Sequence, residues 1–232
     1  MATEPPSGSD TGPTDPPVEQ DPAAPDRVDP GQASDTSRLE TFADGVMAIA
    51  ITLLILLVAV PSHVRGAGNL ARALWEQWPS YAGYVVSFLT IGVIWVNHHH
   101  MFKLIERTNH AFLMMNVVFL MTIAFLPWPT ALVAEYVHDA QGRTVATVVY
   151  GLTMVAIAIM FNVVWRYASG RGRLLSSGVD PQAIARSRRD YLAGPIVYSI
   201  ATLLALWNPY VSLAIFAALA VYWLLPGTGP RA

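Results

Sequence analysis

Residues 38–57, RLETFADGVMAIAITLLILL, decide the fold of this chain. Charged side chains stand near the start of the stretch, and none follows Asp44 before Pro61. A bilayer core about 30 Å thick needs ~20 apolar helical residues to cross it. The run Gly45–Val60, extended upstream by Leu39–Asp44, therefore predicts a first membrane-spanning helix that stops at Pro61.

Five further apolar runs follow and suit the same role. The last two are at the short limit for a span and are joined by little more than Asn208-Pro209. They form either a tight helical hairpin or one interrupted stretch. Six is the better count, which predicts an all-α polytopic membrane protein with six transmembrane helices. The five runs are Pro79–Met101, Ala111–Ala134, Thr144–Trp165, Tyr191–Trp207 and Pro209–Leu225.

The third run contains Pro127 and Pro129 near its end. Prolines two residues apart open a helix and free carbonyl groups that need other partners. We expect these prolines to end the helix at the outer membrane face rather than to shape a pore mouth.

Composition separates a polar tail from an apolar remainder. The chain is 53% apolar and only 13% charged, whereas soluble domains average about 25% charged. Residues 1–37 hold eight prolines and carry −7 (eight acids against one arginine), while the remainder carries +5. We expect a disordered, acidic, proline-rich cytoplasmic tail at 1–37, a six-helix transmembrane domain at 38–226 and a short cytoplasmic tail at 227–232. A soluble enzyme is nearly excluded.

The basic residues predict how the chain is oriented. With both termini cytoplasmic, eleven lysines and arginines fall in inner segments and three in outer loops. This positive-inside bias predicts a multi-pass protein of the cell membrane with cytoplasmic N and C termini. No basic stripe interleaved with aromatic residues is present, which argues against nucleic acid as a partner. The chain has no cysteine, which excludes disulfides and cysteine-ligated metals.

The first run carries a stripe of side chains and one acid that points elsewhere. At about 100° per residue, Gly45, Ile49, Thr52 and Leu56 fall within roughly 60° of one another. Asp44 lies well outside that arc. Alone, such a stripe is more typical of helix packing. An acid at the mouth of an apolar helix is usually paired and functional, or else it accepts hydrogen bonds at the helix start.

The second run ends in Trp95-Val96-Asn97-His98-His99-His100. Adjacent side chains diverge by about 100°, so three consecutive histidines do not ligate one metal from one helix face. We expect one histidine to pack on Trp95 and pair with Asp44, with the others at the interface. The remaining histidines lie in loops or at run ends, which argues against a haem site.

These residues resemble the first-helix signature of the transmembrane protein 175 family of endosomal and lysosomal potassium channels and their prokaryotic relatives. The family pattern Arg-x-x-x-Phe-Ser-Asp matches Arg38, Phe42 and Asp44, with Ala43 in place of the serine. Further matches are Trp95-x-x-His98 with Phe102, and Asn116 followed by Leu126-Pro127-Trp128-Pro129-Thr130. The resemblance covers about residues 38–132, and it implies a six-helix unit.

One unit per chain resembles the prokaryotic branch, which implies a homotetramer whose first helices line a potassium-preferring pore. The resemblance implies a hydrophobic constriction at Ile49, a hydroxyl ring at Thr52 and a second apolar ring at Leu56. It also implies a structural network that holds the first helix in place. The partners implied are further copies of the chain, the lipid bilayer and monovalent cations, with no cofactor. The network residues are Arg38, Phe42, Asp44, Trp95, His98 and Asn116.

Two other functions remain open from the residues. The six-helix unit is alternatively a small proton- or cation-coupled transporter in which Asp44 and His98 form a relay. A haem-binding membrane redox protein is the weakest interpretation.

Overall fold

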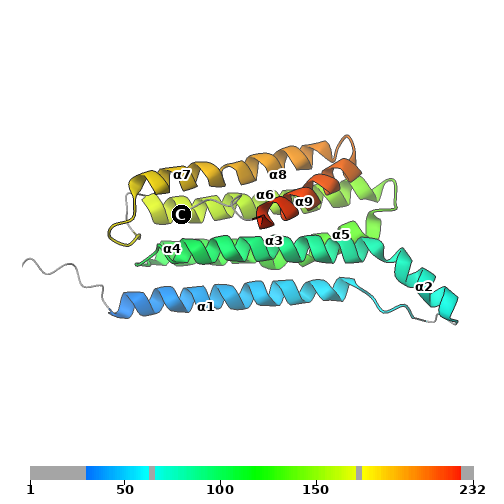
Figure 1. The fold of residues 1–232 in the computed structure, drawn as a ribbon, viewed down its shortest axis with the longest axis horizontal. Helices are drawn as coiled ribbons and strands as arrows, with labels where there is room; N and C mark the ends of the chain where they lie inside the picture. The colour runs from blue at the N-terminus through cyan, green and yellow to red at the C-terminus, as the bar shows by residue number, and fades with distance from the viewer. Residues whose placement is uncertain (1–29, 63–65, 171–173, 226–232) are drawn as a thin grey trace, which may run out of the picture.

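The computed structural model describes residues 30–62, 66–170 and 174–225, and these residues are almost entirely helical (Figure 1). Residues 1–29 of the expected N-terminal tail and the whole expected C-terminal tail at 227–232 lie outside the described residues. The first helix begins upstream of the expected boundary between 37 and 38, so residues 30–37 belong to it. The elements are α1 (Pro30–Leu53), the 3-10 turn η1 (Leu54–Leu57), α2 (Ala67–Glu76), α3 (Trp78–Phe102), α4 (His110–Phe125), α5 (Pro127–Tyr136), α6 (Gly142–Ser169), α7 (Pro181–Tyr191), α8 (Ala193–Leu204) and α9 (Pro209–Leu224).

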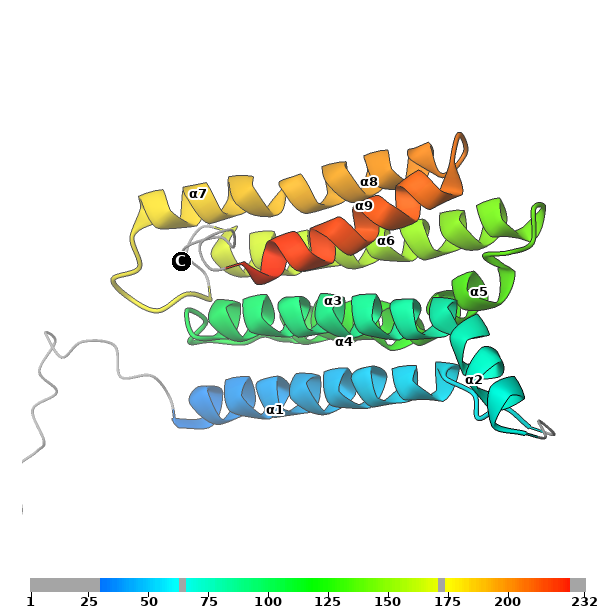
Figure 2. The same cartoon turned by 45° about the vertical axis from the view of Figure 1, so that its right-hand side comes forward.

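Long helices lying side by side make up the body of the molecule, with α1 along one edge (Figures 1 and 2). α6 lies centrally and packs against α4, α5, α8 and α9, while α1 packs against α3 and α4. Among the described residues, four helical stretches are long and apolar enough to cross a membrane: Thr36–Leu57, Trp78–Phe102, His110–Tyr136 and Gly142–Ser169. The prediction of an all-helical, polytopic membrane protein is therefore confirmed.

The last two apolar runs form a hairpin of two short helices. α8 continues from α7 after Leu192 and packs against α9. The turn between them ends at Asn208, whose side-chain oxygen accepts the backbone N–H groups of Tyr210 and Val211. This N-cap and the proline that follows it start α9 afresh, so the two runs are not one interrupted helix.

The prolines of the third run restart a helix rather than end it, which corrects the expectation from sequence. α4 ends at Phe125, and α5 begins at Pro127 and continues to Tyr136. Pro127 is tolerated because the first residues of a helix need no N–H donor. Thr130 secures the junction, since its hydroxyl lies 2.8 Å from the Leu126 carbonyl and 2.9 Å from the Ser87 hydroxyl.

Two short helices, α2 and α7, lie outside the apolar runs that predict membrane spans. In α2, Arg72 donates to Glu76 at 2.8 Å, and this hydrogen bond raises the pKa of Arg72 above its ordinary value. In α7, Asp180 caps the first turn by accepting the Gln182 N–H at 2.9 Å. The dipeptide Asp180-Pro181 was a usable signal, because an N-cap acid followed by proline is typical of a helix start.

α1 buries one narrow face against α3 and α4. Its buried residues recur every three or four positions, which is the helical period. Ala43, at the position where the family pattern has serine, is fully buried on this face. The orientation of α1 thus follows from its own side chains, and its opposite face is left uncovered. The buried residues of α1 are Thr36, Leu39, Ala43, Met47 and Ala50, and Leu54 continues this face into η1.

Candidate pore-lining helix

The stripe singled out in the sequence lies on the uncovered face of α1, and its last member, Leu56, lies in the 3-10 turn η1 that follows. Gly45, Ile49, Thr52 and Leu56 are all exposed, with Ile49 61% and Leu56 74% accessible. Apolar side chains this exposed need lipid, further copies of the chain or a pore next to them. The chain alone therefore leaves this face available for one of those roles.

The Thr52 hydroxyl is turned back onto its own helix. Its oxygen lies 2.9 Å from the Ile49 carbonyl and donates its proton there. A hydroxyl has one donor and two acceptor lone pairs, so this bond leaves both lone pairs free. Oxygen lone pairs are what a potassium ion uses in place of its hydration water.

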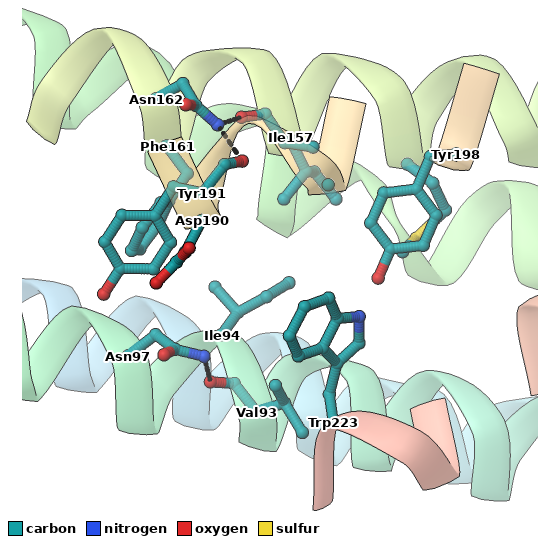
Figure 3. Close-up of a pocket in the computed structure, with 13 residues that line it drawn as sticks. Val93, Ile94, Asn97, Ile157, Phe161, Asn162, Asp190, Tyr191, Tyr198 and Trp223 are labelled. Atoms are coloured by element: carbon teal, nitrogen blue, oxygen red, sulfur yellow. Dashed lines mark hydrogen bonds between the residues drawn. The ribbon is translucent and has the colours of Figure 1, made fainter. Parts of the chain in front are cut away.

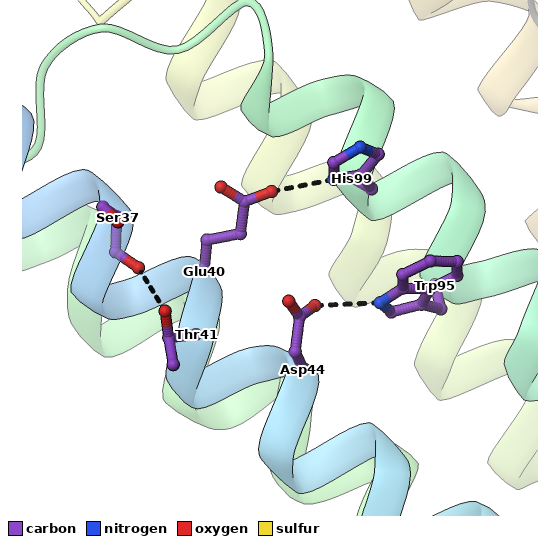
Figure 4. Close-up of polar contacts among 6 residues, drawn as sticks. All are labelled: Ser37, Glu40, Thr41, Asp44, Trp95 and His99. Carbon is purple, nitrogen blue, oxygen red and sulfur yellow. Dashed lines mark hydrogen bonds and ion pairs between the residues drawn. The ribbon is translucent and has the colours of Figure 1, made fainter.

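Asp44 faces α3 rather than the stripe (Figure 4). The Trp95 indole N–H donates to Asp44 Oδ1 at 2.9 Å. One turn earlier on α1, Glu40 Oε1 lies 2.9 Å from His99 Nδ1, and the His99 ring stacks on Trp95 at a centroid distance of 5.8 Å. One histidine, His99, does pack on Trp95, as expected. Its acidic partner is Glu40 and not Asp44, because Asp44 accepts the hydrogen bond of the Trp95 indole.

His98 belongs to a different contact, between α3 and α4. Its side chain is fully buried, and its ring stacks on Phe102 and Phe119 at centroid distances of 4.4 and 5.7 Å. His98 Nε2 lies 3.4 Å from Asn116 Oδ1. Asn116 donates its own amide N–H to the Phe112 carbonyl, so Asn116 offers its oxygen and His98 Nε2 is the donor.

Four of the six expected network residues are thus brought together in two separate pairs. Arg38 and Phe42 are not brought in: both are exposed on α1, and within the described part of the chain Arg38 forms no hydrogen bond or ion pair. Glu40 and His99 were missed. Their spacing was the available signal, since each lies four residues from a member of the Asp44–Trp95 pair, on the same helix face.

Within the described residues, no three histidine, aspartate or glutamate side chains lie together as candidate metal ligands. The chemistry that α1 offers is therefore that of an apolar surface with a hydroxyl in its middle.

Known proteins share this arrangement of helices. Residues 38–127, which run from α1 into the first proline of α5, match the family described as the endosomal/lysosomal potassium channel TMEM175. A potassium channel from Streptomyces collinus is 43% identical over 82% of this chain and 92% of its own length. This chain belongs to the TMEM175 family. A potassium channel from Chamaesiphon minutus is 42% identical over 85% of this chain and 98% of its own.

The TMEM175 fold extends beyond the matched motif. The crystal structure of a lysosomal potassium-selective channel TMEM175 homolog from Chamaesiphon minutus superposes with a TM-score of 0.74 at 40% identity. It covers 82% of this chain and 96% of that one. The family is one of channels, not of enzymes, in agreement with the conclusion from composition.

We expect the Glu40–His99 pair to contribute little to stability. The two side chains are 29% and 39% exposed, and pairs of this kind typically couple by about 0.2–1 kcal/mol. A double-mutant cycle with Glu40→Gln and His99→Gln, read by thermal unfolding in detergent, measures the coupling directly. A coupling above about 2 kcal/mol would show that this pair is a principal clamp on α1.

Proposed function

We propose that this TMEM175-family chain is a potassium channel of the cell membrane that conducts through a central pore of a homotetramer. Six transmembrane segments form each unit, with α8 and α9 added to the four long spans, and both termini are cytoplasmic. The observation that carries the proposal is the two-sided α1. One face is held on α3 and α4, and the other, which η1 continues, presents Ile49, Thr52 and Leu56, all exposed in the described part of the chain.

Around a four-fold axis, the Ile49 side chains narrow the pore. An apolar ring resists hydrated ions and dewets easily, so this ring limits conductance. The Thr52 hydroxyls follow, and their free lone pairs replace part of the lost hydration. Leu56 forms a second apolar ring beyond them. Selectivity is modest, because single hydroxyls supply fewer and weaker dipoles than stacked backbone carbonyls.

The acidic and aromatic residues hold α1 at the correct angle. Asp44 bonds to Trp95 and faces away from the stripe, and His98 bonds to Asn116. A transporter relay from Asp44 to His98 receives no support, because no hydrogen bond joins them among the described residues and the Asp44 partner is an indole, which has only a donor N–H.

Potassium flux from liposomes containing the purified chain tests this function. We expect ohmic, potassium-preferring currents and flux that persists without a pH gradient. Saturable uptake that requires a pH gradient would instead establish the transporter with Asp44 and His98 as its relay.

Thr52→Val is expected to reduce the preference for potassium over sodium while leaving the protein folded. Valine keeps the shape of threonine but removes the hydroxyl. The readout is the ratio of potassium to sodium flux in liposomes. Thr122→Val on α4 is the matched control, because the Thr122 hydroxyl also donates to a carbonyl three residues back, that of Phe119. An equal loss of the potassium preference in both variants would contradict the assignment of Thr52 to the pore.

A further inference from the structure

A second site lies on the far side of α3 from the pore helix. A cavity of about 90 Å³ opens between α3, α6, the α7–α8 junction and α9 (Figure 3). Its α3 wall includes Val93 and Asn97, each two residues from a residue that contacts α1. Positions two apart on a helix point in nearly opposite directions, about 200° apart. The cavity is therefore separate from the stripe of Ile49 and Thr52.

Aromatic rings form much of the cavity wall. Phe161, Tyr191, Tyr198 and Trp223 all line it, and Phe161 and Tyr191 are in edge contact at a centroid distance of 4.8 Å. The wall is held in place by Asn162, whose amide donates to the Ala158 carbonyl at 2.9 Å and to the Tyr191 carbonyl at 2.8 Å. These bonds tie the α7–α8 junction to α6, so the cavity is preformed.

The charge of the lining is negative. Among the described residues that line the cavity, Asp190, at the end of α7, is the one carboxylic acid, and none is a lysine or arginine. Three arginines precede Asp190 on α7. Arg186 is engaged with Asp180 at 3.8 Å and Arg188 with the Ser169 hydroxyl at 2.7 Å, and Arg189 is not among the lining residues. Within the described part of the chain, the Asp190 carboxylate forms no ion pair or hydrogen bond.

Oxygen atoms face the same space from other elements. Figure 3 shows the Asp190 carboxylate turned toward α3 and the Tyr198 hydroxyl pointing into the cavity from α8. The Asn97 side-chain amide donates a hydrogen bond to the Val93 carbonyl at 2.9 Å, so the Asn97 side-chain oxygen remains available as an acceptor. A free carboxylate beside several aromatic rings suits a cation, because ring faces attract positive charge.

We propose that this cavity binds an organic ammonium group attached to a small apolar body. The ammonium sits at Asp190 and donates hydrogen bonds to the surrounding oxygens, and the apolar body packs among the rings. The volume suits a small organic group, since one water needs only about 10–15 Å³ on the same scale. Both soluble amines and the head group of phosphatidylethanolamine carry this chemistry.

Calorimetric titration of the purified full chain in detergent with benzylamine tests the site. Benzyl alcohol has the same ring without the charge, so it reports binding to the apolar wall alone. We expect benzylamine to bind at least tenfold more tightly than benzyl alcohol. Asp190→Asn should abolish that difference, because it removes the charge and keeps the shape of the side chain. Glu135→Gln, at an exposed acid on α5 outside the cavity, should change nothing.

Two results would overturn the site: equal binding of benzylamine and benzyl alcohol to the wild type, or unchanged benzylamine binding to Asp190→Asn. Tyr198→Leu supplies a second variant inside the cavity and should also weaken benzylamine binding. Repeating the titration in nanodiscs with and without phosphatidylethanolamine separates the two sources of ammonium. If phosphatidylethanolamine competes with benzylamine, the lipid head group is the occupant. If it does not compete, the occupant is a soluble amine. None of these measurements depends on conduction.

Discussion

Replacing Ile49 by asparagine is expected to raise potassium flux about tenfold or more and to weaken the preference for potassium. Ile49 is the most constricting position in the proposed pore, and it is 61% exposed. Liposome flux, compared at equal amounts of reconstituted protein, measures the change.

The size of this effect follows from hydration. A fully buried isoleucine side chain differs from an exposed one by about 1.5–3 kcal/mol in transfer free energy. A tenfold change in rate needs only about 1.4 kcal/mol. Four polar side chains in a ring therefore lower the dewetting barrier by enough to dominate conductance. Sodium flux should rise as well as potassium flux, because either ion loses less of its hydration water in a wetter pore. The preference for potassium therefore weakens.

Ile196→Asn is the matched control. Ile196 is an exposed isoleucine on α8, across the bundle from α1 (Figure 2). Potassium flux through the Ile196→Asn variant should therefore stay at the wild-type level. Ile49→Cys adds a test of the four-fold arrangement, because the chain has no other cysteine. Thiolates converging on an axis bind soft divalent metals, so cadmium should block flux in Ile49→Cys and not in Ile196→Cys. Unchanged flux in Ile49→Asn with the tetramer intact would contradict the pore assignment.

The second large effect is expected from Asp44→Ala, which should lower the thermal unfolding midpoint and the yield of assembled protein. The substitution removes the acceptor for the Trp95 indole, 2.9 Å away. A hydrogen bond to a charged group contributes about 1.5–3 kcal/mol. At about 2–4 °C per kcal/mol for a chain of this size, the midpoint should fall by roughly 3–12 °C. Thermal unfolding and size-exclusion chromatography in detergent measure both quantities.

The cause of the Asp44→Ala effect can be isolated. Asp44→Asn keeps a side-chain oxygen and should retain most of the stability. Trp95→Phe removes the donor and should match Asp44→Ala, and the double variant should be no worse than either single one. Glu135→Ala, at an exposed acid on α5, controls for loss of charge alone. Additive losses in the double variant would show that Asp44 and Trp95 stabilise the protein through other contacts.

Much of the helical architecture was predictable because membrane insertion is a property of single segments. The apolar run after Asp44 had to be a helix, since the bilayer core offers no water to satisfy an open backbone. The short helices α2 and α7 were missed, because they are not apolar enough to be identified by hydrophobic length. The prolines at 127 and 129 were misjudged, because a proline at a helix start and one that ends a helix look alike in one sequence.

The division between sequence and tertiary structure is clearest on α1. The sequence by itself determined that Ile49, Thr52 and Leu56 share one face and that Asp44 does not, because helical geometry fixes these directions locally. Only the tertiary structure decided which partners Asp44, Glu40 and His98 take. Those partners lie up to 59 residues away in the chain, and their choice depends on how α1, α3 and α4 pack. The same holds for the Asp190 cavity, whose walls come from helices that meet only when the bundle is assembled.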